Sequence, residues 1–290
     1  MHGADPLSPE LLARVGGALG HPVSVRQEVA GGDINQAALL EGPEGPIFLK
    51  WNAGALPRLF SCEAEGLAAL RDAHALRVPR VLAVEDPAPD RPGFLALEYV
   101  VAGRQDGAWF EALGRGLAEL HRVRARSFGF HEANYLASLE LDNTWSDSWV
   151  EFLVERRLAP LARLADLRPE VRRRLDALLA RLGQLVPAHP PASRLHGDLW
   201  AGNVLAGASG EPVLIDPAVF HGHREVDLAM SELFGGFSPR FHAAYREAWP
   251  LEPGYERRRE VYQLLPLLVH VILFGAGYEA QVDSRLRRLS

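Results

Sequence analysis

The spacing of hydrophobic residues changes at Gly103, and this change constrains the fold more than any other feature of the 290-residue chain. Before Gly103, short apolar runs alternate with polar residues and are separated by turn-rich segments, as in β-strands. After it, apolar residues recur every three or four positions, as in amphipathic helices. Because a chain of this length accommodates one large domain or two smaller ones, the sequence predicts an α+β fold of two lobes.

The two lobes are expected to differ in architecture. Residues 1–100 contain five strand-like segments and one helix-like segment, which predicts a small antiparallel sheet with one helix. Residues 101–290 are expected to form a larger, mainly helical lobe. Its helices are predicted at 110–120, 149–164, 169–186 and from about 225 onward.

Lys50 is the only lysine among 31 basic residues and lies in a predicted strand. This position therefore favours a compact ammonium group, which the planar guanidinium of arginine does not supply. Because side chains alternate across a strand, Ile47, Leu49 and Trp51 share one face, and Phe48 and Lys50 share the other. We expect Lys50 to face a site of chemistry.

A helix predicted over Phe60–Ala73 carries the acidic residue most suited to partner this lysine. Glu63, Leu67 and Leu70 lie on one face of that helix, whereas Glu65 points elsewhere. Glu63 is thus the carboxylate on the face that packs toward the core.

Composition and charge exclude several classes of protein. Acidic residues outnumber basic ones by 37 to 31, and no segment concentrates arginine, so the electrostatic attraction that drives nucleic-acid binding is lacking. The only cysteine, Cys62, has no partner for an internal disulfide, and residues 1–20 lack the pattern of a secretory signal. We expect a cytoplasmic protein whose partners include no nucleic acid.

The most apolar run of the chain, 264–276, is the one segment to test for membrane insertion. It contains Pro266 and His270 and is shorter than the roughly 20 residues that span a bilayer. It predicts a buried helix, and no membrane partner.

One cluster of polar residues carries the predicted chemistry. His196, Gly197 and Asp198 form an H-G-D triplet, Asn203 follows Asp198 by five positions, and Asp216 follows Asn203 by thirteen. Phosphoryl transfer needs a carboxylate that orients the attacking hydroxyl, and hard oxygen ligands that hold Mg²⁺ on a triphosphate. The spacing therefore favours a kinase.

The order of these features along the chain resembles the protein-kinase-like superfamily. H-G-D stands where protein kinases carry H-R-D, and I-D-P stands where they carry D-F-G, as in aminoglycoside and choline phosphotransferases. The resemblance implies a two-lobe protein-kinase-like fold. ATP and Mg²⁺ would bind between an N-terminal ATP-binding lobe, 1–100, and a C-terminal catalytic and substrate-binding lobe, 101–290.

Longer segments resemble the fructosamine kinase, or ketosamine kinase, family. These segments are His196–Asn203, Ile215–Ala218, Gly222–Met230, Asn143–Trp145, Leu233–Phe237 and Val261–Leu264. The resemblance implies ATP-dependent phosphorylation of a sugar hydroxyl, expected at O3, on a ketosamine such as fructosamine or ribulosamine. The amine of that ketosamine would be free or belong to a glycated protein side chain.

The same resemblance implies roles for individual residues. Asp198 would orient the acceptor hydroxyl or accept its proton, and Asn203 and Asp216 would bind Mg²⁺. Lys50 would hold the α- and β-phosphates of ATP and pair with Glu63.

Further ATP contacts would come from a turn and from the linker between the lobes. Gly31, Gly32 and Asn35 belong to a turn that would approach the phosphates, although this turn departs from the G-x-G-x-x-G of protein kinases. Backbone groups of Glu98 and Val100 would hydrogen-bond adenine.

Five residues near the catalytic cluster need separate interpretation. Trp200 either stacks on the sugar or packs in the core, and we favour a substrate contact. His196 is expected to support the loop rather than to act as an acid or base, and Asp227 is expected to brace the loop from the following helix. The pair His221 and His223 would suit a transition metal only with further ligands, so we interpret both as loop or supporting residues.

Two other functions stay open at this point. One is a kinase of the aminoglycoside or choline phosphotransferase type, and the other is a catalytically silent nucleotide-binding module. The silent module is disfavoured because its hallmark, loss of Lys50, Asp198, Asn203 or Asp216, is not seen. The sequence leaves the oligomeric state open, with a monomer as one option.

Overall fold

The computed structural model describes residues 7–29, 35–54 and 56–290. In its N-terminal part, antiparallel strands form one sheet in the order β1-β2-β3-β5-β4. The strands are β1 Ser24–Val29, β2 Gln36–Gly42, β3 Gly45–Asn52, β4 Val81–Glu85 and β5 Gly93–Glu98.

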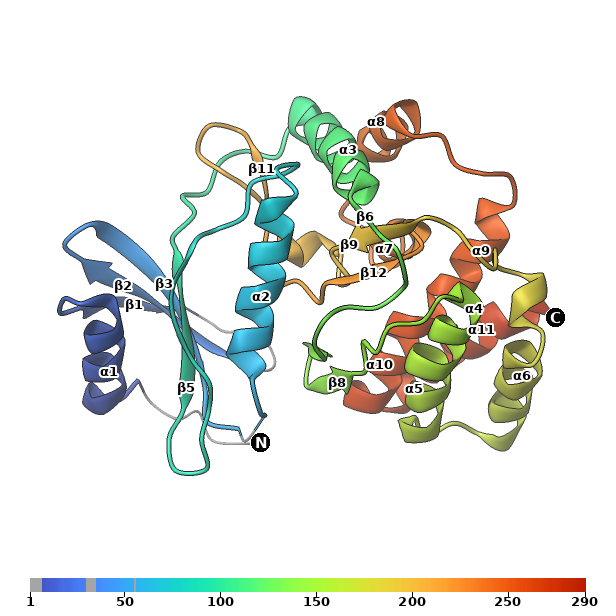
Figure 1. Ribbon diagram of the computed structural model, residues 1–290, viewed down its shortest axis with the longest axis horizontal. Coiled ribbons are helices and arrows are strands. Elements are labelled where there is room, and N and C mark those ends of the chain that lie inside the picture. Colours follow the sequence, from blue (N-terminus) through green and yellow to red (C-terminus); the bar gives the residue numbers. More distant parts are fainter. Residues whose placement is uncertain (1–6, 30–34, 55) are drawn as a thin grey trace.

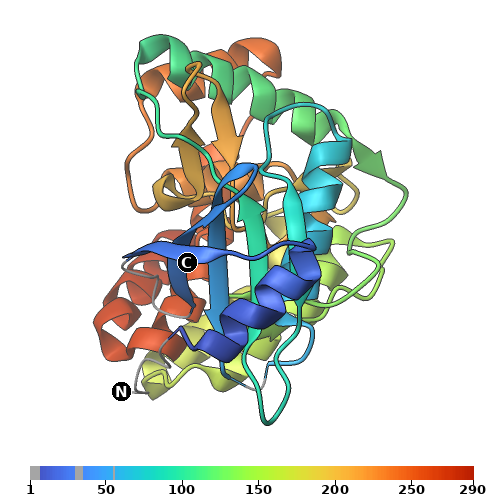
Figure 2. The same cartoon turned by 90° about the vertical axis from the view of Figure 1, so that its left-hand side faces the viewer.

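The two faces of this sheet are covered differently. Helix α1, Pro9–Leu19, lies across the outer face, and α2, Leu59–Asp72, lies on the opposite face, toward the rest of the molecule (Figures 1 and 2). The outer face buries Ile47, Leu49 and Trp51 in a small core with α1, as the alternation in the sequence predicts. Lys50 is on the inner face.

The sequence prediction of one helix before residue 101 is wrong, because α1 is a second one. The signals for it were present. Ser8 caps its first turn through a hydrogen bond from the amide of Leu11, Pro9 occupies its first turn, and Gly20 ends it with φ +80°. The segment is short, so its apolar periodicity spans few turns.

The remainder of the chain is mainly helical (Figure 1). Its longer helices are α3 Gly107–Arg122, α4 Trp149–Leu153, α5 Ala159–Leu164, α6 Pro169–Leu179, α7 Glu225–Ser231, α8 Pro239–Ala248, α9 Tyr255–Tyr262, α10 Leu264–Phe274 and α11 Glu279–Leu289. Single helical turns of other types are η1 Val154–Leu158, η2 Leu182–Gln184, η3 Ala201–Asn203 and η4 Ala276–Tyr278. Short strands are β6 Arg124–Ala125, β7 Asn134–Leu136, β8 Leu139–Leu141, β9 Ala192–Leu195, β10 Val204–Ala206, β11 Pro212–Leu214 and β12 Phe220–Gly222.

Two predicted helices differ from those observed. The helix expected over 149–164 is present, but a π-helical turn, η1, joins α4 to α5 within it. The helix expected over 169–186 ends at Leu179, and only the short turn η2 follows. Neither difference moves a predicted site residue.

The most apolar run forms α10, but its burial is uneven. The helix is buried through most of its length, whereas its last residue, Phe274, is 50% exposed. The prediction of a buried helix therefore fails for the last turn. In the described part of the chain, every helix is too short or too polar to cross a bilayer.

The segment that leads from the sheet to α3 packs tightly against the β10–β11 hairpin. The amide of Gly103 donates a hydrogen bond to the carbonyl of Ala206 at 2.8 Å. A Cβ atom on Gly103 would lie 2.0 Å from the carbonyl oxygen of Gly207, so the close approach requires glycine.

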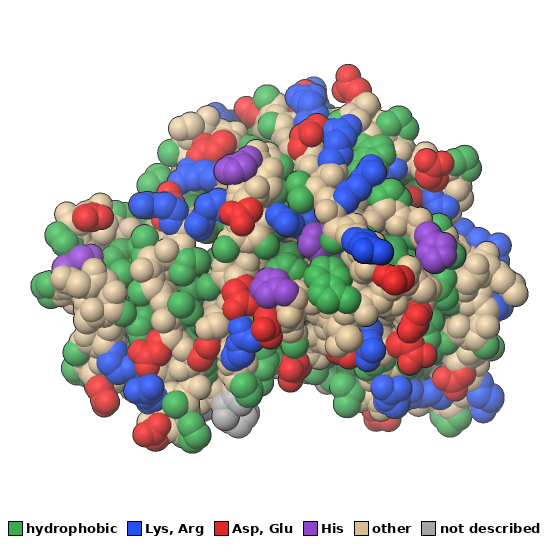
Figure 3. Space-filling model, in the orientation of Figure 1, with side chains coloured by type: hydrophobic (Ala, Val, Ile, Leu, Met, Phe, Trp, Pro, Cys, Tyr) green, Lys and Arg blue, Asp and Glu red, His purple; other side chains and the backbone are tan. Residues whose placement is uncertain are grey.

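Over the face shown in Figure 3, acidic and basic side chains are interspersed.

Candidate active site

The loop that follows β9 has a backbone conformation that requires glycine at position 197. Gly197 has φ +85°, and a Cβ atom there would lie 1.9 Å from the carbonyl oxygen of Ala218. Both the conformation and the contact exclude a side chain. The central residue of the H-G-D triplet is thus glycine because the chain at Ala218 passes directly against it.

His196 holds this loop to the segment that follows β11 and carries Asp216. Its Nε2–H donates to the carbonyl of Ile215 at 2.9 Å, and its Nδ1 accepts from the amide of Asp198 at 3.3 Å. One nitrogen donates and the other accepts, so the ring is neutral. Burial lowers the pKa of His196 and favours this state. The arrangement is that of a supporting residue.

Asp227 on α7 holds the backbone of the same loop through hydrogen bonds. Its carboxylate accepts hydrogen bonds from the amides of His196 at 2.7 Å and Gly197 at 3.0 Å. His121 Nε2 lies 3.1 Å from the same carboxylate, and His121 Nδ1 lies 2.8 Å from the hydroxyl of Tyr245. Although burial favours the neutral acid, these donors hold the pKa of Asp227 below its ordinary value. Sequence reasoning missed Tyr245 because its position on α8 gives no local signal.

Asp198 and Asn203 lie together at the open side of the loop. The Asn203 side-chain amide donates to the Asp198 carboxylate and to the Asp198 backbone carbonyl, each at 2.9 Å. Burial raises the pKa of Asp198 to about 7, and the carboxylates of Asp216 and Asp227 act in the same direction. The carboxyl group therefore changes charge near neutral pH.

The ammonium group of Lys50 joins two carboxylates from different parts of the chain. Its Nζ lies 2.8 Å from Oε1 of Glu63 on α2 and also contacts Oδ1 of Asp216. Burial opposes the charge on Lys50, but attraction to the two carboxylates outweighs this and raises its pKa. Asp216 adopts φ +54°, a strained conformation for a residue with a side chain.

These groups line one cleft with a volume of about 1730 Å³. Lys50, Glu63, Asp198, Asn203 and Asp216 all face it. Further lining residues come from the start of β2, the end of β3, the β7–β8 turn, and the end of α10. The structure thus brings together residues from both the sheet and the helical part of the chain.

Of four other predicted site residues, two line the cleft and two lie outside the described part of the chain. Asn35 lines the cleft, and its side-chain oxygen accepts a hydrogen bond from Asn52 at 2.9 Å. Trp200 also lines the cleft and is 42% exposed, so it is not a core residue. Gly31 and Gly32 lie outside the described residues.

Glu98 and Val100 are not among the residues that line this cleft. The amide of Glu98 donates to the carbonyl of Arg80 at 2.9 Å, and its side chain forms an ion pair with Arg77 at 2.6 Å. Arg77 also pairs with Glu211 on the β10–β11 hairpin. This ion-pair bridge was not predicted, because nothing near Arg77 in the sequence identifies partners so distant along the chain. The adenine contact stays a prediction.

Several neighbouring groups can be assigned structural roles. The Cys62 thiol donates to the carbonyl of Ala133, and burial raises its pKa to about 11, which keeps it unreactive at neutral pH. His223 Nδ1 lies 2.7 Å from the hydroxyl of Tyr262. Throughout the described residues, no three His, Cys, Asp or Glu side chains, His221 and His223 included, are grouped to hold a metal ion.

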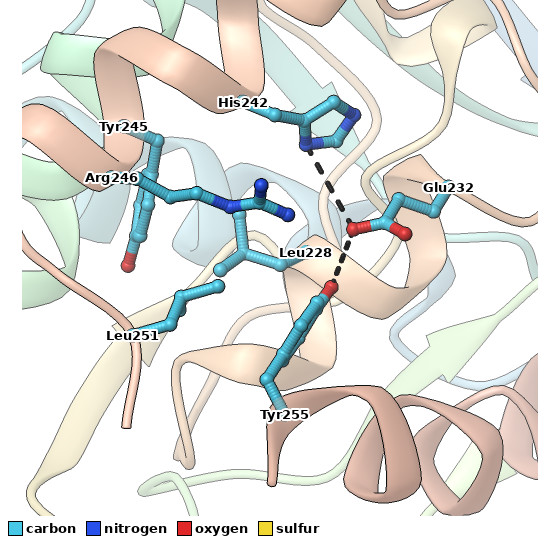
Figure 4. Close-up of a pocket in the computed structure, with 7 residues that line it drawn as sticks. All are labelled: Leu228, Glu232, His242, Tyr245, Arg246, Leu251 and Tyr255. Carbon is cyan, nitrogen blue, oxygen red and sulfur yellow. Dashed lines mark hydrogen bonds and ion pairs between the residues drawn. The ribbon is translucent and has the colours of Figure 1, made fainter. Parts of the chain in front are cut away.

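A second recess lies among α7, α8 and α9 (Figure 4). Tyr255 and His242 both point toward Glu232, and the hydroxyl of Tyr255 donates to it at 2.7 Å. The recess has no room for even a water-sized sphere, so the cleft around Asp198 is the candidate site.

Comparisons with known proteins agree with this geometry. The family model described as fructosamine kinase matches residues 12–290. A Synechocystis protein named as a ketoamine kinase is 37% identical over 92% of this chain and 90% of its own length. A chloroplastic protein of Oryza sativa subsp. indica, named protein-ribulosamine 3-kinase, is 35% identical over 90% of this chain and 78% of its own.

Solved structures show the same fold. A Thermobifida fusca protein named as a fructosamine-3-kinase superposes with a TM-score of 0.88 at 37% identity, over 96% of this chain and 98% of its own. An aminoglycoside phosphotransferase superposes with a TM-score of 0.65 at 14% identity, over 97% of each chain, and so shares the fold alone. The predicted α+β, two-lobe, protein-kinase-like fold is confirmed.

Proposed function

The chain belongs to the fructosamine kinase family, and we propose that it uses Asp198 to transfer the γ-phosphoryl group of ATP to a sugar hydroxyl of a ketosamine. The observation that carries this proposal is the meeting of Lys50, Asp198, Asn203 and Asp216 in one cleft. The acceptor oxygen is O3, which agrees with the ribulosamine 3-kinase name of a relative.

Asp198 receives the acceptor hydroxyl. Its carboxylate accepts a hydrogen bond from that hydroxyl and takes its proton as the new oxygen–phosphorus bond forms and the bond from the γ-phosphorus to the bridging oxygen breaks, which releases ADP. A base whose pKa lies near neutrality suits this task, and burial raises the pKa of Asp198 to about 7. The amide of Asn203 fixes the orientation of the carboxylate through its hydrogen bond at 2.9 Å.

Lys50 binds the α- and β-phosphates. It is held at the cleft by Glu63 at 2.8 Å, so it needs little further ordering when the nucleotide enters. When phosphate oxygens arrive, the ammonium group exchanges part of its contact with Asp216 for contact with the nucleotide. Asn35, and with it the turn that contains Gly31 and Gly32, approaches the phosphates. Backbone groups of Glu98 and Val100 contact adenine.

Asn203 and Asp216 fit a Mg²⁺ ion. Their side chains supply an amide oxygen and a carboxylate, which are the hard oxygen ligands that this ion prefers. The Asn203 nitrogen faces Asp198, so its carbonyl oxygen is the atom turned away from that carboxylate. When bound, the ion neutralises charge on the transferring phosphoryl group.

The remaining site residues orient the substrate and the loop. Trp200 stacks on the sugar, which its position on the cleft and its 42% exposure support. His196 and Asp227 hold the loop that carries Asp198. The carrier amine is free or part of a glycated protein side chain, and the reaction is one of protein deglycation in the cytoplasm.

The test is ADP release by the purified protein with Mg-ATP across a panel of acceptors. The panel contains fructosyl-lysine, ribulosyl-lysine, a glycated protein, free sugars, choline and aminoglycosides. We expect turnover on ketosamines alone. Turnover only on choline or an aminoglycoside would overturn the substrate class.

An Asp198→Asn variant separates chemistry from binding. We expect it to bind ATP with unchanged affinity and to release no substrate-dependent ADP. Wild-type protein that binds ATP but phosphorylates none of the acceptors would instead indicate a silent nucleotide-binding module.

A further inference from the structure

Besides the catalytic groups, the last turn of α10 and η4 also border the cleft. Leu273, Phe274 and Tyr278 line this part of it, and Phe274 is 50% exposed. The sequence predicts burial for the apolar run that ends here, but the structure leaves its last turn open to the cleft. Apolar side chains that gather at a concave surface mark a binding site.

Aromatic rings are concentrated in this part of the cleft. We call Phe234, His270, Phe274 and Tyr278 the distal aromatic group. The ring of His270 is at its centre, 4.7 Å from that of Phe234, 4.8 Å from that of Tyr278 and 5.4 Å from that of Phe274, measured between ring centroids. His270 Nδ1–H donates to the carbonyl of Pro266 at 2.8 Å, which fixes the plane of this ring. The four rings therefore form a connected apolar wall.

Phe234 is followed by a glycine turn that helps to set its position in this wall. Gly235 and Gly236 follow it with φ +76° and +89°, conformations that favour glycine. A Cβ atom on Gly236 would lie 2.4 Å from that of Ala201 in the catalytic loop. The turn therefore packs on the catalytic loop, and the position of Phe234 is fixed relative to Asp198.

The charged side chains that line the cleft come from other elements than the distal aromatic group. Lys50, Glu63, Asp198 and Asp216 supply every Lys, Arg, Asp or Glu side chain among the described lining residues. Ligand cavities usually have volumes of about 300–1,000 Å³, whereas this cleft has about 1730 Å³. It therefore has room for a third ligand segment besides nucleotide and sugar, against its apolar lining.

We propose that the distal aromatic group binds the carrier chain of the ketosamine, that is, the methylene stem of the lysine side chain whose nitrogen bears the sugar. The inference rests on the proposed function and names the part of the substrate that lies beyond the amine. A stem of methylene groups packs on aromatic faces while its polar ends stay solvated. The sugar then lies toward Asp198, and the carrier leaves the cleft across Phe274.

The test uses ketosamines that share one sugar and differ only in carrier length. Fructosyl derivatives of methylamine, butylamine and hexylamine are compared by kcat/KM with saturating Mg-ATP. For the wild type we expect kcat/KM to rise by about two- to fourfold per methylene group. The Phe274→Ala and Tyr278→Ala variants should flatten this dependence while leaving kcat/KM for the methylamine derivative within about twofold.

Matched variants control for folding and for ring chemistry. Leu164→Ala removes a 64% exposed apolar side chain that does not line the cleft, and it should retain the wild-type dependence on chain length. Phe274→Leu keeps an apolar surface and should retain most of the dependence. Circular dichroism and the methylamine rate report whether each variant is folded.

Each outcome bears on one claim. No turnover on any ketosamine refutes the proposed function itself. Turnover that is independent of chain length in the wild type, or a dependence that Phe274→Ala and Tyr278→Ala leave intact, refutes only the carrier site. A rise in KM for ATP in these variants with unchanged chain-length dependence would assign the group to the nucleotide, and would also overturn the inference.

Discussion

Replacement of Asp198 by asparagine should abolish activity and also stabilise the protein. Burial raises the pKa of this carboxyl from 3.8 to about 7, so the folded protein binds the proton more tightly than the unfolded chain does. The stability that this group contributes is therefore fully present below about pH 4 and is lost as the pH rises through 7. Each pKa unit corresponds to about 1.4 kcal/mol, so the charged carboxylate costs at most about 4 kcal/mol above pH 7.

Asparagine carries no charge and keeps an oxygen that accepts the hydrogen bond from Asn203. We expect Asp198→Asn to match the wild type near pH 4, to exceed it in free energy of unfolding by a margin that grows with pH, and to reach a plateau above pH 7. Urea denaturation at pH 4, 5, 6, 7 and 8, without nucleotide, measures the margin. The control is Asp166→Asn, at an exposed carboxylate. A margin for Asp198→Asn that is independent of pH, or one that shrinks as the pH rises, would show that the carboxylate is not destabilised by burial.

Three further predictions address the same loop. Gly197→Ala should lower the free energy of unfolding by more than about 2 kcal/mol in urea denaturation, because alanine at φ +85° places its Cβ against the carbonyl of Ala218; a neutral effect would contradict the close approach. Asp227→Asn should lower the free energy of unfolding by about 2 kcal/mol and lower kcat at least tenfold, because two backbone amides lose a charged acceptor. An unchanged kcat in a folded variant would show that catalysis does not depend on these hydrogen bonds to the loop. The kcat/KM for ketosamine should rise about tenfold per pH unit below 7 and level off above it, since the free enzyme needs Asp198 unprotonated; a rate that is flat from pH 5 to 8 would argue against Asp198 as the base.

The parts of the site that follow from local periodicity were predictable from the sequence. Alternation in one strand places Lys50 on the face of the sheet opposite to that of Leu49. Helical spacing places Glu63 on the face of its helix that packs inward. The two side chains meet at 2.8 Å. Their partnership needed only the assumption that the helix packs on the inner face of the sheet.

Features that depend on contacts between distant segments were not predictable. The bridge from Arg77 to Glu98 and Glu211 joins residues 21 and 134 positions apart. The apolar run that ends in α10 gives no sign that its last turn opens into the cleft, because burial there depends on which segments pack against it. Helix α1 is a different case, since its cap residues are explicit and only its short length hides its periodicity.

The three aspartates around the loop share a chemistry but differ in environment, and the differences support the separate roles that we propose for them. Asp227 accepts hydrogen bonds from two amides, which lowers its pKa, so it stays charged and holds the backbone. Asp216 pairs with the ammonium group of Lys50, so its carboxylate already lies beside a cation. Asp198 has only the neutral amide of Asn203 to offset burial, and no cation contributes to its pKa among the described residues. Titratable groups whose environments drive their pKa values apart take different roles, and the group left near neutrality is the one able to take a proton and return it.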